Sequence, residues 1–354
     1  MILFTGSAGT FGSRRTPLNK YWLSFEKKMK HIIGYAIKII ALAMSGYHLY
    51  VAFTGTPNAT VFRSVHLGFA LVLTFLVYDI HGRKSKEPSM PDLLLAVAAV
   101  GVGAYPVIFV DYIYSRFYMV DPITTGDWVF GVMAVLLVLE ATRRIVGLAL
   151  PITAGLFLGY AIFFTGVSKA EIIDQLYLTT EGILGIPIAV SATYLILFVI
   201  FGAFVERAGI GRLFMNFALS VAGHTAGGPA KVAVITSSLF GTVTGNGVAN
   251  VMTTGVFTIP MMIRSGYRPA FAGAVEAVAS TGGQILPPIM GASAFLMAEF
   301  MGVSYIKVCG YALIPALLYY IAVMFSVHFE AKRSGLVGLP RKDIPNTKTV
   351  IKND

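Results

Sequence analysis

Two clusters of glycine and polar residues lie inside sequence that is otherwise apolar enough to cross a bilayer. The first is GTVTGNGVANVMTTG, at 241–255, and the second is ASTGGQILPPIMGAS, at 279–293. A helix broken within hydrocarbon frees backbone N–H and C=O groups that find no water there. Such breaks survive only where protein or a polar cavity satisfies those groups. Two breaks close together therefore predict a polar site at membrane depth.

The composition excludes a soluble domain. Of 354 residues, 56% are hydrophobic and 12% are charged, which is typical of a polytopic membrane protein. The formal net charge is +10, but most Lys and Arg residues fall in alternate loops, which is a topology signal. No basic patch interleaved with stacking aromatic residues is present, so nucleic acid is not an expected partner. The single cysteine, Cys309, excludes an intramolecular disulfide and is expected to serve packing.

The run at 232–263 predicts a re-entrant helical hairpin. It is apolar except for its Gly/Asn/Thr centre, and cationic residues flank both ends. Positive residues favour the cytoplasmic side, and each arm is shorter than the roughly 20 residues that a full span needs. Both ends are therefore expected on the cytoplasmic side, with the tip at Gly245-Asn246-Gly247. The next segment, at 269–300, is long enough to span but is interrupted at 281–288, which predicts one broken helix.

Breaks of this kind provide binding chemistry. Carbonyls at the C-terminus of a half-helix can hold a cation, and N–H groups at an N-terminus can hold a carboxylate. Because sodium prefers oxygen ligands, we expect a sodium site between the tip and the break. The alternative is that the glycines only allow close helix packing and the prolines only kink. The candidate sodium ligands are Gly245, Asn250, Thr281 and Gly282. The full candidate set for ion or substrate binding is Gly245, Asn246, Gly247, Asn250, Glu276, Thr281, Gly282, Gly283, Gln284, Pro287 and Pro288.

Glu276 lies two turns before the Gly-Gly break, inside an apolar segment. A carboxylate in such a place is a functional candidate by default, with Arg268 or a cation elsewhere as its partner. The other interpretation is a structural hydrogen-bond partner for the broken helix. Catalysis is not expected, because the chain has no H-E-x-x-H, no G-x-S-x-G and no second cysteine. No organic cofactor is expected either.

The expected topology starts with a cytoplasmic basic arm at 1–30, which places the N-terminus inside. Glu140, Arg143 and Arg144 can form i,i+3 or i,i+4 pairs at the inner end of the fourth helix. The other expected helices, in chain order, lie at about 31–53, 62–80, 91–110, 128–148, 150–166, within 168–185 at the outer interface, at 186–204, and at 307–329.

Several segments resemble the fused permease of tripartite ATP-independent periplasmic (TRAP) transporters, in the branch served by TAXI-type receptors. They are GGPAKVAV, GNGVANVMTTG, FTIPMM, SGYRPAFAGAVEAVASTGGQILPPIMGA and PALLYY. The resemblance runs from about residue 31 to the C-terminus. It implies an all-α polytopic fold with a four-helix, small-subunit-like domain at 31–148. The first inverted repeat of an elevator-type large subunit is then expected at 149–340, with a cytoplasmic tail and a truncation point at 341–354.

The same resemblance implies a function. It implies a multi-pass component of the bacterial inner membrane that uses the sodium gradient. The substrate would be an organic-acid-like solute accepted from a periplasmic TAXI-type receptor. A sodium/organic-anion symporter that needs no receptor is the alternative. Members of the family often carry paired serines at the hairpin tip, where this chain has Asn246 and Gly247, so the ion ligands at these two positions depart from the family pattern.

Overall fold

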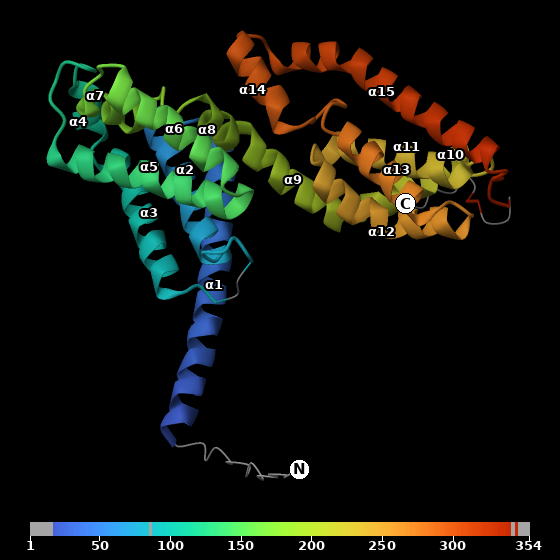
Figure 1. Cartoon of the computed structure of the whole chain (residues 1–354), viewed down its shortest axis with the longest axis horizontal. Coiled ribbons are helices and arrows are strands. Elements are labelled where there is room, and N and C mark those ends of the chain that lie inside the picture. Colours follow the sequence, from blue (N-terminus) through green and yellow to red (C-terminus); the bar gives the residue numbers. More distant parts are fainter. Residues whose placement is uncertain (1–16, 85–86, 341–343, 346–354) are drawn as a thin grey trace, which may run out of the picture. The chain divides into compact units, whose positions relative to one another are not determined.

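Every regular element among the described residues is helical (Figure 1), which confirms the predicted all-α class for this part of the chain. The computed structural model describes residues 17–84, 87–340 and 344–345, with side chains from residue 32 onward. Most of the predicted arm at 1–30 and of the predicted tail at 341–354 thus lies outside the described residues.

The helices follow the predicted order, with three main differences, of which one is the short helix α4 in a segment where no helix was predicted. The first helix begins at Pro17 rather than at residue 31, because proline suits the first helical position and no Gly or Pro interrupts the chain before Gly34. An unpredicted helix, α10, follows Arg207. The elements are α1 Pro17–Thr54, α2 Ala59–Val77, α3 Met90–Ile108, α4 Val110–Ser115, α5 Thr125–Val146, α6 Ala149–Phe164, α7 Lys169–Ile173, the π-helical turn η1 Asp174–Leu178, α8 Ile186–Val190, the π-helical turn η2 Ser191–Leu195, α9 Ile196–Arg207, α10 Ile210–Ala222, α11 Gly228–Thr244, α12 Gly247–Arg264, α13 Pro269–Gly282, α14 Ala292–Met301 and α15 Tyr305–Arg333.

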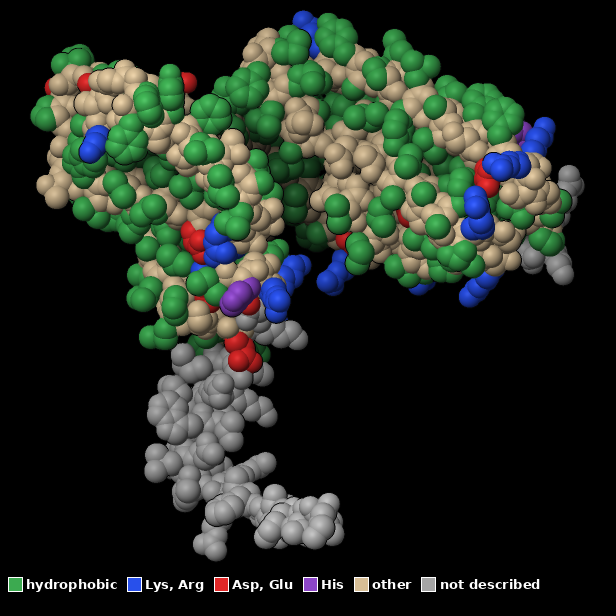
Figure 2. Space-filling view, in the orientation of Figure 1, with side chains coloured by type: hydrophobic (Ala, Val, Ile, Leu, Met, Phe, Trp, Pro, Cys, Tyr) green, Lys and Arg blue, Asp and Glu red, His purple; other side chains and the backbone are tan. Residues whose placement is uncertain are grey.

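Several helices have the length and apolarity that a membrane span requires. Among the described residues there are five such segments: Ile32–Thr54, Ala59–Val77, Met90–Ile108, Ile186–Arg207 and Tyr305–Arg333. Large hydrophobic side chains are exposed along four of them, all but Ala59–Val77, and Figure 2 shows such side chains over much of the visible surface. Exposed apolar area on this scale is what a lipid-facing surface presents. The chain is therefore a polytopic membrane protein.

The chain folds into two compact units. The first contains the residues up to Met44 together with Leu67–Asp174, and the second contains Ser45–His66 and the chain from Gln175 onward. In this division α6 groups with the first unit, and the predicted domain boundary near residue 148 stays a prediction. The likeness of 31–148 to a small membrane subunit stays a prediction.

Buried ion pairs hold the first unit together. Arg144 Nη1 on α5 lies 2.7 Å from Asp92 Oδ1 in the first turn of α3, and both side chains are 1% exposed. Arg143 and Arg144 also pair with Glu140 at 2.7 Å, as the i,i+3 and i,i+4 spacing predicts. The pair with Asp92 was not predicted, and it fixes the start of α3 against the end of α5.

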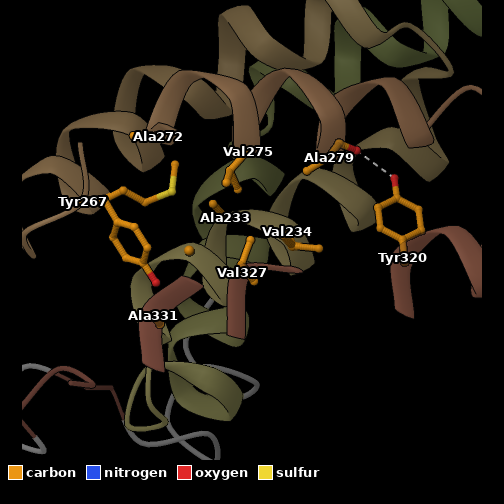
Figure 3. Close-up of a cluster of buried hydrophobic side chains, with 11 residues drawn as sticks. Ala233, Val234, Tyr267, Ala272, Val275, Ala279, Tyr320, Val327 and Ala331 are labelled. Atoms are coloured by element: carbon orange, nitrogen blue, oxygen red, sulfur yellow. Dashed lines mark hydrogen bonds between the residues drawn. The ribbon is translucent and has the colours of Figure 1, made fainter. Parts of the chain in front are cut away.

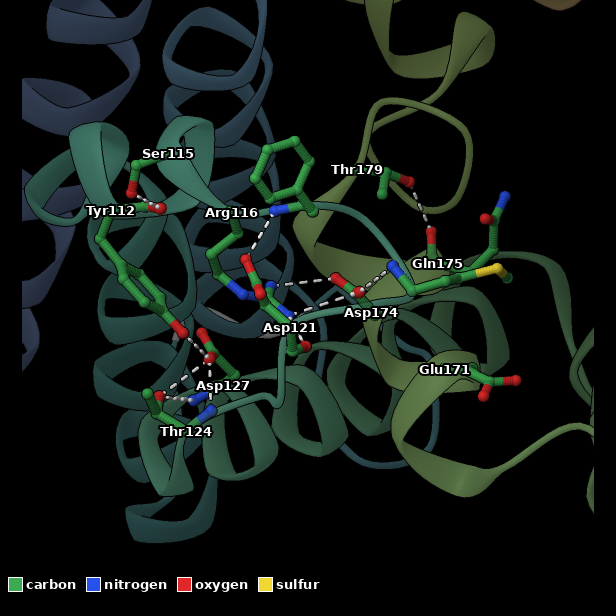
Figure 4. A network of polar contacts seen from close by, with 12 residues as sticks. Tyr112, Ser115, Arg116, Asp121, Thr124, Asp127, Glu171, Asp174, Gln175 and Thr179 are labelled. Carbon is green, nitrogen blue, oxygen red and sulfur yellow. Dashed lines mark hydrogen bonds and ion pairs between the residues drawn. The ribbon is translucent and has the colours of Figure 1, made fainter.

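A second polar network joins the loop after α4 to the rest of the first unit (Figure 4). Arg116 Nη1 lies 3.1 Å from Asp174 Oδ1, and both side chains are buried. Asp127 accepts hydrogen bonds from Thr124, which caps α5, and from the hydroxyls of Tyr105 and Tyr112. Burial raises the pKa of Tyr112, so its hydroxyl remains a donor at neutral pH.

The core of the second unit lies between α11, α13 and α15 (Figure 3). Alanines make up much of this core, which allows the helix backbones to approach closely. Tyr320 on α15 donates a hydrogen bond to Ala279 O at 2.9 Å. Gly283 N, the i+4 partner of that carbonyl, bonds to Ser280 O instead, so Tyr320 satisfies a carbonyl that the end of α13 leaves free.

The turn between α12 and α13 is also fixed in this unit. Tyr267 lies there, buried, and its hydroxyl donates to Gly227 O at 3.4 Å. Burial, with a smaller effect of the Glu330 carboxylate, raises the pKa of Tyr267 to about 12. The neutral hydroxyl therefore links this turn to the start of α11 throughout the physiological pH range.

Candidate functional site

The predicted hairpin tip is a two-residue turn between α11 and α12. Gly245 ends α11 with a φ of +59°, and a Cβ there would overlap Met290 O. Asn246 then begins α12 as its N-cap, with Oδ1 accepting from Val248 N at 3.0 Å and from Ala249 N at 3.2 Å. The turn at Gly245-Asn246 confirms the predicted tip, although Gly247 already belongs to α12.

The predicted helix break lies between α13 and α14, at 283–291. Thr281 and Gly282 are the last residues of α13, so the break begins two residues after its predicted start. It contains a cis peptide bond between Pro287 and Pro288. Pro288 O accepts a hydrogen bond from the Tyr305 hydroxyl at 2.9 Å, which ties the break to α15.

The tip and the break contact one another. Ile289 N donates to Thr242 O at 3.3 Å. A Cβ on Gly283 would lie 2.6 Å from the Cα of Gly241, so the two backbones touch. Gly247 lies against Thr281 and the Gln284 side chain. The structure thus brings the two glycine clusters into one site, and within the described residues Gly245 O accepts no hydrogen bond.

The candidate residues differ in exposure at this site. Gly245, Gly247, Asn250, Glu276, Gly282 and Gly283 are buried, whereas Asn246, Thr281, Gln284 and Pro288 are exposed and Pro287 is half-buried. Asn250 donates through Nδ2 to Ser237 O at 2.7 Å, leaving Oδ1 as its acceptor. The exposed amide of Gln284 and the hydroxyl of Thr281 border the same contact.

Glu276 lies in a cage of hydroxyl groups away from the tip. The carboxylate is fully buried. Oε1 accepts from Thr254 at 2.5 Å, from Ser237 at 2.9 Å and from Ser280 at 3.1 Å. Oε2 accepts from Thr258 at 2.5 Å. Helices α11, α12 and α13 therefore meet at this one carboxylate, and Thr254 connects it to Asn250 Oδ1 at 3.2 Å.

The suggested pair between Glu276 and Arg268 is wrong. Arg268 is exposed and lies 3.4 Å from Glu330 Oε1 on α15. The physical reason is location: Arg268 precedes α13 at the protein surface, whereas Glu276 is two turns further along and faces α11 and α12. No cation from the described residues contacts the Glu276 carboxylate, so hydroxyl donors alone stabilise it there.

Replacing Glu276 by glutamine is expected to lower the free energy of unfolding by about 1–3 kcal/mol, because an amide NH₂ would face hydroxyls that now donate. Thr281→Val is the matched control. The Thr281 hydroxyl donates to Ala277 O, an intrahelical bond on an exposed surface, so we expect a change within about 0.5 kcal/mol. Reversible unfolding in mixed micelles measures both. Equal stability of Glu276→Gln and the unchanged protein would show that the cage does not depend on an acceptor carboxylate.

The four hydroxyl partners of Glu276 were not among the predicted site residues. A signal for them was present in the sequence. Asn250, Thr254 and Thr258 recur every four residues, which places them on one face of a helix, and Ser280 follows Glu276 at the same spacing. Polar residues aligned on one face of an apolar helix indicate a buried polar partner.

Comparison with known proteins gives relatives that are transport proteins rather than enzymes. The isethionate TRAP transporter permease protein DctMQ of Oleidesulfovibrio alaskensis is 27% identical over 282 residues, which covers 77% of this chain and 39% of that protein. The C4-dicarboxylate TRAP transporter large permease protein DctM of Pseudomonas aeruginosa is 31% identical over 144 residues, covering 41% and 33%. The sialic acid TRAP transporter large permease protein SiaM of Vibrio cholerae is 30% identical over 144 residues, covering 41% and 33%. The matches span well under half the length of these relatives.

The family assignment follows from a wider match. The sequence profile described as "Tripartite ATP-independent periplasmic transporter, DctM component" matches residues 133–354. This range contains the hairpin α11–α12, the broken helix α13–α14 and the hydroxyl cage around Glu276. Since the match covers more than half of the chain, the chain belongs to the DctM family of TRAP transporter permeases.

Proposed function

We propose that this chain is the membrane component of a sodium-coupled secondary importer of the bacterial inner membrane, with its N-terminus in the cytoplasm. It receives an organic-acid-like solute from a periplasmic binding protein of the TAXI type. The hairpin-bearing unit moves in an elevator-type step, and sodium binds where the hairpin tip meets the helix break. The ligands we propose for sodium are Gly245 O, Asn250 Oδ1, Thr281 and Gly282 O.

The observation that carries this proposal is the contact between the tip and the break. Two glycine-rich interruptions of apolar helices would be unfavourable for a purely structural subunit, because each frees backbone groups. Here the interruptions touch, through Gly241 and Gly283, and Gly245 O lies near Gly291. Backbone carbonyls and amide oxygens at paired half-helix ends are hard ligands suited to a sodium ion.

The names of the relatives support the substrate class. Isethionate, C4-dicarboxylates and sialic acid, which the three relatives are named for, all carry an acidic group. For this chain we infer only that the substrate carries an acidic group, because the chain spans 33–39% of the relatives' lengths. N–H groups at half-helix N-termini are suited to such an anion, and α14 begins at the break with no side-chain cap.

Uptake into proteoliposomes tests the proposal. The protein is reconstituted, and a labelled organic acid is supplied with the candidate receptor and an inward sodium gradient. We expect accumulation that disappears when potassium replaces sodium or when the receptor is left out. Accumulation without the receptor would favour the alternative, a sodium/organic-anion symporter. Absence of any gradient-dependent accumulation would contradict both.

The sodium ligands are tested by two substitutions. Asn250→Ala and Thr281→Ala each remove one proposed oxygen ligand, and we expect each to raise the sodium concentration for half-maximal uptake by about tenfold, the effect of roughly 1.4 kcal/mol. Ser326→Ala is the control, because its hydroxyl bonds to Ala322 O on the exposed side of α15. If both variants keep the sodium dependence of the unchanged protein, the site lies elsewhere.

A further inference from the structure

A cavity that the proposed transport site does not use lies beside the turn from α9 to α10. Its volume is about 390 Å³, and it extends from that turn to the middle of the hairpin. The end of α9 contributes Glu206 and Arg207, the first turn of α10 contributes Arg212, and the hairpin contributes Thr236 and Thr253. All of its walls belong to the second unit, and it borders the hydroxyl cage through Thr254.

The cavity is electropositive at the start of α10. Gly209 is the N-cap of this 13-residue helix and provides no capping side chain, and Gly209 and Gly211 both line the cavity. The first turn of α10 contains no acidic residue, although the N-terminus of a helix favours negative charge. Arg207 and Arg212 add two guanidinium groups, and neither pairs with a described residue.

Thr236 is a second, independent feature of the cavity wall that points to a ligand. Its side chain is 1% exposed, and its hydroxyl has no hydrogen-bond partner among the described residues. A buried polar atom without a partner is unfavourable by about 1–3 kcal/mol, so such atoms are few in proteins. A ligand oxygen in the cavity would provide the missing partner.

One group on the cavity wall opposes an anion. Glu206 carries a carboxylate whose Oε1 accepts from the Thr253 hydroxyl at 3.4 Å. Two guanidinium groups, the uncapped start of α10 and the Thr236 hydroxyl, all of them hydrogen-bond donors, oppose this one negative charge. The donors therefore outnumber the acceptors, and the arrangement suits an oxyanion that receives hydrogen bonds from several sides.

We infer that this cavity is a binding site for a phosphate group, held by Arg207, Arg212, the N-terminus of α10 and the Thr236 hydroxyl. The phosphate belongs either to the headgroup of a phospholipid or to a free cytoplasmic anion. This site is separate from the proposed sodium and solute site, and its existence does not depend on transport.

Binding is measured directly on the purified chain in a neutral detergent at constant ionic strength. The probes are inorganic phosphate and dioctanoyl phosphatidylglycerol, with chloride and dioctanoylglycerol as probes that lack phosphate. We expect the phosphate-bearing probe to raise the unfolding temperature in a saturable manner. Saturation by inorganic phosphate identifies a free anion, and saturation by the phospholipid alone identifies a headgroup; either result supports the site. A response to neither, or an equal response to the probes without phosphate, would overturn it.

Three variants locate the bound group. Arg207→Gln and Arg212→Gln are each expected to weaken binding about tenfold, as the loss of a charged hydrogen bond does. Thr236→Val should weaken binding while leaving the unfolding temperature without ligand unchanged or higher, because it removes a hydroxyl that has no partner. Arg264→Gln is the matched control, since Arg264 is exposed, belongs to the same unit and does not line the cavity. An equal loss in Arg264→Gln would show unspecific charge attraction and would overturn the assignment.

Discussion

Replacing Arg144 by leucine is expected to lower the free energy of unfolding by about 3–5 kcal/mol, because it leaves Asp92 buried without its cation. The two side chains are 1% exposed and 2.7 Å apart. Arg144 also donates to Tyr78 O and to Glu140, so a single side chain holds three segments of the first unit. The measurement is reversible unfolding by a denaturing detergent in mixed micelles.

Two further variants separate this buried charge from ordinary surface pairing. Arg143→Leu breaks the pair with Glu140, in which both side chains are about a quarter to a third exposed, and we expect a loss of about 1 kcal/mol or less. The double variant Asp92→Leu/Arg144→Leu should recover much of the stability, because no unpaired charge remains. Equal losses for Arg143→Leu and Arg144→Leu would contradict the role given to the Asp92 pair.

Changing Gly245 to alanine is expected to separate the hairpin tip from the helix break. The residue has a φ of +59°, which disfavours any L-residue by about 1–2 kcal/mol. The new Cβ would also overlap Met290 O. Both groups are fixed to the backbone, so no side-chain rotation relieves the overlap. We expect the free energy of unfolding to fall by at least about 2 kcal/mol and sodium-dependent uptake to be lost.

Gly273→Ala is the matched control for that substitution. Gly273 lies within α13, in the same unit, and a Cβ there meets nothing within 4 Å. We expect alanine to leave stability unchanged or to raise it by up to about 1 kcal/mol, because it favours the helix over the unfolded chain. If Gly245→Ala behaved like Gly273→Ala in unfolding and in uptake, the close contact of tip and break would have no importance for either property.

The features that could be predicted from the sequence depend on neighbouring residues. The tip at Gly245-Asn246 combines a glycine suited to positive φ with an asparagine suited to capping, and these signals act within one turn of helix. The break after α13 was predicted for similar reasons, from Gly282-Gly283 and Pro287-Pro288. Its limits were shifted by two or three residues, as helix ends are the least determined part of such a pattern.

The features that could not be predicted depend on tertiary contacts. Asp92 and Arg144 are separated by 52 positions in the sequence, and no local pattern pairs them. The hydroxyl cage around Glu276 forms only when three helices pack in register. In the sequence, the only sign of it was the four-residue spacing of polar residues along single helices. Helix α10 lies between the expected helix at 186–204 and the expected hairpin at 232–263, and no helix was predicted in that interval.

The hydroxyl of Tyr320 has a consequence for any motion of the hairpin. This side chain belongs to α15 and donates its hydrogen bond to a carbonyl near the end of α13. If α13 and α15 shifted relative to one another, that buried carbonyl would lose its partner. A displacement of the tip and the break would therefore be accompanied by a displacement of α15. Any lipid in contact with the exposed surface of α15 would then have to rearrange whenever the hairpin moves.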